Sequence, residues 1–146
     1  MEQRLSVITL GVNNLIISRN FYEKTLGWKP AAENKDIVFY RMNGFLLSIT
    51  SRTSLAGFIG MPDEGHGFRG LTLSYYLSNE EEVTKLYYEL TNKGVNLLKE
   101  PTAPPFGGLF FYFSDPDGNI LEVACNSFVE YDDKMNAIGH KPINHL

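Results

Sequence analysis

Short alternating runs and helical runs follow one another in the first part of the chain. Residues 4–12 form a β-branched, alternating stretch that is typical of a strand buried on both faces. After two asparagines that can cap a helix, apolar residues recur at helical spacing up to Gly27 and predict a helix of about three turns. Residues 37–42 and 45–51 then predict two strands joined by Asn43-Gly44, a strong hairpin signal because both turn positions tolerate positive φ.

The same order of elements recurs in the second part of the chain. Residues 70–77 predict a strand, and residues 78–82 are typical of a capped, acidic helix start that leads into an apolar helical face ending at Gly94. Three further strands are predicted at residues 95–98, 109–114 and 120–125, the last two joined by the turn Asp115-Pro116-Asp117-Gly118.

A short sequence on the first predicted helix has a counterpart on the second. Phe21-Tyr22-Glu23 recurs as Tyr87-Tyr88-Glu89, and both triplets lie on a helix between two predicted strands. This repeat indicates an internal duplication of one βαβββ unit.

The domain organisation follows from where these patterns stop. We expect a single domain over residues 1–126, with module one at 4–51 and module two at 69–126. Residues 52–68 contain several glycines and no sustained period, so they are interpreted as a linker or flap. Residues 127–146 turn polar and are expected to form a tail that packs over the domain or a partner.

Composition and charge exclude several classes of partner. The 146 residues carry a formal charge of −4, and the 13 Lys and Arg residues are scattered, so neither nucleic acid nor a membrane surface is an expected partner. The single cysteine, Cys125, rules out an internal disulfide and is interpreted as a small buried hydrophobe. No signal peptide and no apolar run near the ~18 residues of a membrane span occurs, so we expect a cytoplasmic protein.

Two stretches of the chain resemble the ends of one known superfamily. The first is Ile8-Thr9-Leu10-Gly11-Val12 with Leu15, Ser18, Phe21-Tyr22 and Leu26-Gly27-Trp28, and the second is Phe113-Ser114-Asp115-Pro116-Asp117-Gly118-Asn119-Ile120-Leu121-Glu122-Val123. They resemble the glyoxalase, bleomycin-resistance and extradiol-dioxygenase relatives, the vicinal oxygen chelate superfamily. The resemblance covers residues 4–126 and implies an α+β fold in which two tandem βαβββ modules form a U-shaped mixed sheet with a concave cleft.

The resemblance also implies where metal ligands would lie. Enzymatic relatives place four ligands in the cleft, typically His, Gln or Glu, and these positions fall on Val7, Ser48, Thr72 and Glu122. A first-row metal needs several converging imidazole, thiolate or carboxylate groups, and only Glu122 is of such a type. We therefore expect no metal cofactor, with a divalent metal held by other residues as the alternative.

Seven residues are candidates for lining the cleft: Val7, Thr9, Ser48, Thr72, Phe110, Tyr112 and Glu122. Glu122 is the candidate catalytic residue, because partial desolvation would raise its pKa and suit a general base; the alternative is a carboxylate hydrogen-bonded to a neighbour such as Tyr or Thr. Tyr112 and Phe110 share a strand face and either line the cleft or fill the core. Ser48 and Thr72 either donate hydrogen bonds to a ligand or fill space.

Three classes of function are compatible with these residues. The leading hypothesis is a homodimeric protein that binds a small organic molecule, preferably cationic or hydrogen-bonding, as metal-free bleomycin-resistance relatives sequester a drug. The second is an enzyme: a metal-free isomerase or lyase with Glu122 as base, or a dioxygenase-type metalloenzyme with other ligands. The third is a structural or regulatory dimer whose cleft is filled by its own side chains. The three histidines, His66, His140 and His145, are expected on the surface.

Overall fold

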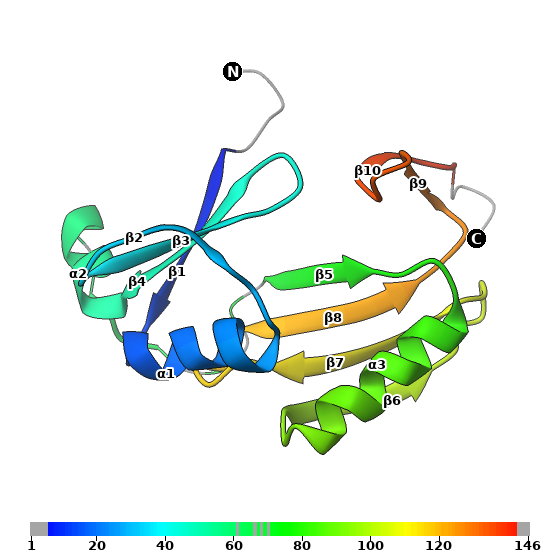
Figure 1. The fold of residues 1–146 in the computed structure, drawn as a ribbon, viewed down its shortest axis with the longest axis horizontal. Helices are drawn as coiled ribbons and strands as arrows, with labels where there is room; N and C mark the ends of the chain where they lie inside the picture. Colours follow the sequence, from blue (N-terminus) through cyan, green and yellow to red (C-terminus); the bar gives the residue numbers. More distant parts are fainter. Residues whose placement is uncertain (1–5, 61, 66, 68, 70, 143–146) are drawn as a thin grey trace. The chain divides into compact units, whose positions relative to one another are not determined.

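The computed structural model describes residues 6–60, 62–65, 67, 69 and 71–142 and divides the chain into two compact units. Unit 1 is Met1–Gly67 and unit 2 is Phe68–Leu146. Each unit contains a four-stranded mixed sheet, so the predicted α+β class with tandem βαβββ modules is confirmed (Figure 1). No helix in the described ranges is both long and apolar enough to cross a membrane.

Unit 1 runs in the order strand, helix and three strands. Its elements are β1 (Val7–Val12), α1 (Leu15–Asn20), the π-helical turn η1 (Phe21–Thr25), β2 (Pro30–Glu33), β3 (Ile37–Arg41) and β4 (Leu46–Ser51). The sheet order is β1-β4-β3-β2, with β1 and β4 parallel and the other pairs antiparallel. Leu10, Val12, Val38, Tyr40 and Ile49 belong to the buried core of this unit.

Unit 2 repeats this topology. Its elements are β5 (Thr72–Tyr76), α3 (Glu80–Asn92), β6 (Asn96–Thr102), β7 (Leu109–Ser114) and β8 (Ile120–Cys125). The sheet order is β5-β8-β7-β6, again with the first and last strands parallel. The helix α3 packs across one face of this sheet (Figure 1), where it covers buried Phe111, Phe113 and Val123.

Both predicted helix starts are confirmed by their caps. The side chain of Asn14 accepts hydrogen bonds from the backbone N–H groups of Ile16 and Ile17, at 3.0 and 3.1 Å. The side chain of Asn79 accepts from the N–H of Glu82 at 2.9 Å, while the Glu82 carboxylate accepts from the N–H of Ser78 at 3.0 Å. Each cap satisfies N–H groups that the first helical turn leaves without partners.

The first helix differs from its prediction as a continuous α-helix. After α1 it widens into the π turn, where the N–H of Leu26 reaches the carbonyl of Phe21 at 3.0 Å. Strand β2 was not predicted. Each of its four residues is exposed, and its Ala-Ala pair gives no alternating apolar signal, while a proline at its start is compatible only with an edge position.

The segment interpreted as a linker or flap, residues 52–68, begins with a helix that the sequence pattern did not predict. This helix is α2 (Arg52–Ile59), capped by the side chain of Ser51 at its start and by Gly60 in the left-handed conformation at its end. It packs on β1 and β4 of unit 1. Its surface is largely exposed, including 92% of Phe58, which explains why no amphipathic period is visible in the sequence.

The polar tail also contains regular structure. Strands β9 (Val129–Tyr131) and β10 (Ala137–His140) form an antiparallel hairpin within unit 2. The hairpin packs on the unit through rings: Phe128 lies 6.2 Å from Phe106, and Tyr131 lies 6.3 Å from Tyr76, centroid to centroid. His140 is exposed as expected, although its ring stacks on Phe128. His66 and His145 lie outside the described residues.

Two glycines, Gly107 and Gly108, precede β7. Gly108 has a φ of 89°, and a Cβ at this position would collide with the backbone carbonyl of Cys125. The close approach is therefore between two segments of unit 2, and only glycine permits it.

The turn of the tail hairpin copies the turn between β7 and β8. The Asp115 carboxylate accepts from the backbone and side-chain N–H groups of Asn119, at 2.8 and 2.7 Å. The Asp132 carboxylate accepts the same two bonds from Asn136, at 2.9 and 2.7 Å. The position before each asparagine has positive φ, but it is Gly118 in the first turn and Met135 in the second.

We expect opposite effects of substitution at these two equivalent positions. A Cβ at Gly118 would meet nothing within 4 Å, so Gly118→Ala should lower the free energy of unfolding by about 1 kcal/mol through backbone strain alone. Met135→Gly should raise it by about 0.5–1 kcal/mol, because glycine relieves the same strain. Urea denaturation measures both. Lys134→Gly is the matched control and should destabilise; stabilisation by Lys134→Gly, or none by Met135→Gly, would contradict this account.

Candidate functional site

A row of four side chains crosses the sheet of unit 2 on the face opposite α3. In the strand register Ser74 of β5 pairs with Glu122 of β8, Glu122 pairs with Tyr112 of β7, and Tyr112 pairs with Lys99 of β6. Directly paired residues place their side chains on the same face of a sheet. The central strand β8 therefore holds Glu122 between neighbours on both sides.

The Glu122 carboxylate accepts one hydrogen bond on each oxygen. The Tyr112 hydroxyl donates to Oε1 at 2.8 Å, and the Ser74 hydroxyl donates to Oε2 at 2.6 Å. The prediction that Glu122 is hydrogen-bonded to a neighbouring tyrosine is thus confirmed for Tyr112; its role as a base stays a prediction. Because a carboxylate has about four lone-pair sites, these two bonds leave acceptor capacity for a ligand.

The tyrosines beside Glu122 are held in their neutral form. Burial, followed by the hydrogen bond to Glu122, raises the pKa of Tyr112 to about 12. Burial and then the negative charge of Glu122 also raise the pKa of Tyr76, against a smaller opposite effect of its hydrogen bond to Asn126. Both hydroxyls therefore remain protonated near neutral pH, and that of Tyr112 donates to Glu122.

Two aromatic rings and a cation continue the row beyond Glu122. The rings of Phe110 and Tyr112 meet edge to face with centroids 5.6 Å apart, as their shared strand face predicts. The Lys99 ammonium lies 5.3 Å from the centroid of the Phe110 ring. The β6–β7 register shifts on both sides of Lys99, and such irregularities redirect side chains.

The tail hairpin adds a third tyrosine beside this face. Tyr131 of β9 packs on Tyr76, and among the described residues its hydroxyl is the one buried side-chain oxygen without a hydrogen-bond partner. Burial is the first cause that raises its pKa to about 12. No sequence pattern indicates a role for Tyr131, because it lies in a polar segment without a clear period.

Thr72, a candidate at a former ligand position, is exposed and pairs with Ile120 rather than with Glu122. The hydroxyl that reaches Glu122 from β5 is instead that of Ser74, two residues further along the same strand face. Sequence reasoning missed Ser74, although strand alternation from Thr72 would have indicated it.

Unit 1 has an equivalent row, but its centre is closed. Thr9 of β1 and Phe39 of β3 flank Ser48 of β4, and the hydroxyls of Thr9 and Ser48 are hydrogen-bonded at 2.7 Å. Ser48 is only 1% exposed, whereas Val7 on the same strand face as Thr9 is 41% exposed. Ser48 therefore fills space and forms a hydrogen bond with Thr9. Filling space is one of the two roles predicted for Ser48.

The residues at the expected ligand positions do not fit a first-row metal. Val7 has no ligand atom in its side chain, Ser48 is committed to Thr9 and Thr72 offers only a neutral hydroxyl, so Glu122 is the single carboxylate among the four positions. Across the described ranges, no group of three or more His, Cys, Asp and Glu side chains is arranged to hold a metal ion.

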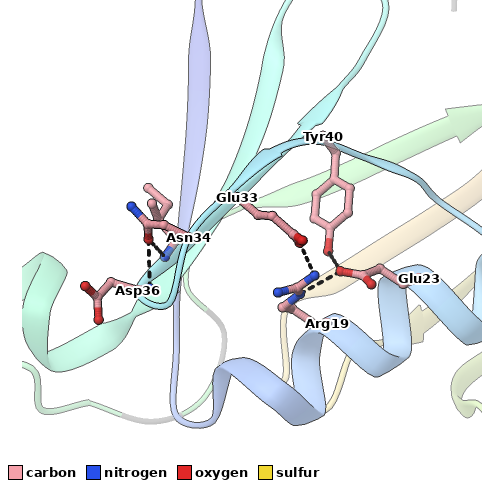
Figure 2. Close-up of polar contacts among 7 residues, drawn as sticks. Arg19, Glu23, Glu33, Asn34, Asp36 and Tyr40 are labelled. Carbon is pink, nitrogen blue, oxygen red and sulfur yellow. Dashed lines mark hydrogen bonds and ion pairs between the residues drawn. The ribbon is translucent and has the colours of Figure 1, made fainter.

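A second polar cluster in unit 1 was not predicted from the sequence (Figure 2). Arg19 of α1 bonds Glu23 through its Nε at 2.7 Å and also contacts the Glu33 carboxylate on β2, while the Tyr40 hydroxyl donates to Glu23 at 3.1 Å. The hydrogen bond between Arg19 and Glu23 is the largest cause of two pKa shifts: it lowers the pKa of Glu23 and raises that of Arg19. Burial and then Glu23 raise the pKa of Tyr40. The cluster connects α1 and its π turn to β2 and β3. Each of its charged side chains, those of Arg19, Glu23 and Glu33, has a partner within the cluster.

Known proteins share this architecture. A model of the Glyoxalase/Bleomycin resistance protein/Dioxygenase superfamily matches residues 4–123. Among solved structures, the chain is similar to a glyoxalase-related enzyme from Fulvimarina pelagi, with 34% identity over 95% of this chain and 99% of that chain and a TM-score of 0.84.

More distant structures share the fold alone. A glyoxalase/bleomycin resistance protein/dioxygenase from Nocardioides is 20% identical, covers 86% of this chain and 84% of that chain, and has a TM-score of 0.74. A lactoylglutathione lyase from Agrobacterium tumefaciens is 17% identical over 86% and 95% of the two chains, with a TM-score of 0.68.

The duplicated βαβββ topology thus defines a protein of the glyoxalase-related class. The chain belongs to the Glyoxalase/Bleomycin resistance protein/Dioxygenase superfamily.

We expect the protein to have no tight divalent metal site. After incubation with Zn²⁺, Ni²⁺, Mn²⁺ or Fe²⁺ and desalting, elemental analysis should find far less than one ion per chain, because Glu122 is the sole ligand-type residue at the expected positions. The melting temperature should not change with chelator. A stoichiometric ion that survives desalting and raises the melting temperature would contradict this expectation.

We expect Tyr131→Phe to stabilise the protein by about 1 kcal/mol, because it removes a buried hydroxyl without a partner and keeps the ring on Tyr76. Denaturation at neutral pH measures the gain, and Tyr76→Phe, which loses the bond to Asn126, is the destabilising control.

The raised pKa of Tyr131 adds a pH signature. Its contribution to stability is complete below the ordinary pKa of 10 and is lost as pH rises towards about 12, because the unfolded state ionises first. The variant should therefore lose less stability than the wild type over that range. Lower stability of Tyr131→Phe at neutral pH would show that the hydroxyl has a partner.

Proposed function

We propose that this chain is a metal-independent binding protein that holds a small organic molecule on the Glu122 face of the β5-β8-β7-β6 sheet. The observation that carries the proposal is the Glu122 carboxylate, fixed by Tyr112 and Ser74 on a half-buried, partly aromatic surface. Small-molecule sites typically combine such apolar walls with a few well-placed polar groups.

The electrostatics of this face favour a ligand that donates hydrogen bonds. Glu122 offers its remaining lone pairs, and the Tyr112 hydroxyl, already donating to Glu122, still has an oxygen that can accept. Hydrogen bonds to a charged group contribute about 1.5–3 kcal/mol, more than neutral ones. An amine, amidine or alcohol is therefore a better ligand here than a simple anion.

Two further features belong to this proposal. We infer that the protein works as a homodimer, as the superfamily resemblance implies, and that it acts in the cytoplasm. Sedimentation analysis tests the first statement, and localisation of a tagged chain tests the second.

A second candidate function is catalytic. The direct bond between the Glu122 carboxylate and the neutral Tyr112 hydroxyl pairs a potential base with a potential acid at one point of the sheet. A metal-free isomerase or lyase would use this pair to move a proton between two atoms of one substrate.

The proposal predicts that binding depends on the charge of Glu122. In a thermal-shift screen, amine-containing hits should raise the melting temperature of the wild type, because a ligand that binds only the folded state stabilises it. Glu122→Gln keeps the shape but removes the charge, and should weaken these hits by about tenfold or more. Tyr112→Phe should weaken them less.

Glu89→Gln is the matched control, because Glu89 is an exposed carboxylate on α3, which covers the other face of the sheet. Hits that shift the wild type, Glu89→Gln and Glu122→Gln equally would refute binding at this face. Product formation from a hit by the wild type, lost in Glu122→Gln while binding persists, would favour the catalytic candidate.

A further inference from the structure

Two opposite charges flank the aromatic centre of the row in unit 2. Glu122 pairs with Tyr112 on one side, and Lys99 pairs with Tyr112 on the other. Adjacent strands lie about 4.8 Å apart, so the backbone positions of Glu122 and Lys99 are separated by roughly 10 Å. Tyr112 lies between the two charged residues in the strand register, and the Lys99 ammonium lies over the ring of the neighbouring Phe110.

The two charges do not neutralise each other. The Glu122 oxygens accept from Ser74 and Tyr112, and the Lys99 ammonium lies over the Phe110 ring. Within the described part of the chain, neither charged group forms an ion pair with another side chain. Both are therefore available to an oppositely charged group of a ligand, and the cation–π contact keeps the ammonium on this face.

From this arrangement we propose that the ligand is a zwitterion, with a cationic end at Glu122, an anionic end at Lys99 and a flat apolar body against the ring of Tyr112. This inference rests on the proposed function and specifies its ligand class. Charge complementarity carries it: a molecule with only one charge leaves the opposite charge of the row without a partner, and such mismatches reduce affinity and specificity.

The length of the row sets the shape of a suitable probe. A benzene ring with charged groups in para positions has a suitable length for a row of two strand spacings, because the side chains of Glu122 and Lys99 cover part of the distance between their backbones. We choose 4-(aminomethyl)benzoate as the zwitterion, with benzylamine and benzoate as analogues that each carry one of its charges.

Isothermal titration calorimetry of the three probes tests the inference. 4-(Aminomethyl)benzoate should bind the wild type at least about fivefold more tightly than benzylamine, and benzoate should bind most weakly. Lys99→Met should reduce the zwitterion to the affinity of benzylamine and leave benzylamine itself unchanged. Glu122→Gln should weaken both amines. Lys85→Met, a matched change of an exposed lysine on α3, should alter none of the three affinities.

The outcomes separate this inference from the proposed function. Equal binding of benzylamine and 4-(aminomethyl)benzoate, with both dependent on Glu122, would overturn the zwitterion and leave the binding face in place. Absence of binding by the zwitterion, while amine hits from the screen still depend on Glu122, would overturn it as well. A zwitterion preference that survives Lys99→Met would show that the anionic end lies elsewhere and would also refute the inference.

Discussion

The parallel pairing of the first and last strands of each unit is the constraint on which the rest of this structure depends. A parallel pair cannot be joined by a tight turn, and each pair here is joined by a helix followed by two further strands. These are α1 with its π turn, β2 and β3 between β1 and β4, and α3, β6 and β7 between β5 and β8. The last strand then lies inside the sheet, with a neighbour on each side. A side chain at the middle of that strand can accept bonds from both neighbours, and Glu122 does so from Ser74 and Tyr112.

The two units use this shared position differently. In unit 1 the middle residue of the last strand is Ser48, flanked by Thr9 and Phe39, and in unit 2 it is Glu122, flanked by Ser74 and Tyr112. Ser48 and Thr9 satisfy each other, and the serine is buried. The Glu122 carboxylate brings a charge that two hydroxyls hold without neutralising. One duplicated topology thus produces a closed centre in unit 1 and a centre with a charged carboxylate in unit 2.

The tail contributes to the second unit with the same local chemistry. Its hairpin turn copies the Asp115–Asn119 turn in the bonds that Asp132 makes to Asn136, although Met135 occupies the position that Gly118 has in the first turn. The hairpin places Tyr131 beside Tyr76 and Phe128 beside Phe106. The hairpin therefore adds Tyr131 to the aromatic side chains on this face, through its contact with Tyr76.

Local signals in the sequence determined most of the element order, both helix caps and the duplicated topology, and the resemblance to a known superfamily indicated Glu122 and Tyr112 as candidate site residues. Asn14, Asn79 and the Asp115 turn act within a few residues, so their effects can be recognised without knowing the fold. Strand β2 and helix α2 were not predicted because their sequences show no clear apolar period, and their conformation depends on what they pack against. The π turn lies in a segment with a helical apolar period, but that period does not distinguish a π turn from an α-helix. Strand register and packing likewise decided that the hydroxyl of Ser74, and not that of Thr72, reaches Glu122. They also decided the approach of Lys99 to Phe110 and the placement of Tyr131. These link residues distant in the sequence, and only the tertiary structure fixes them.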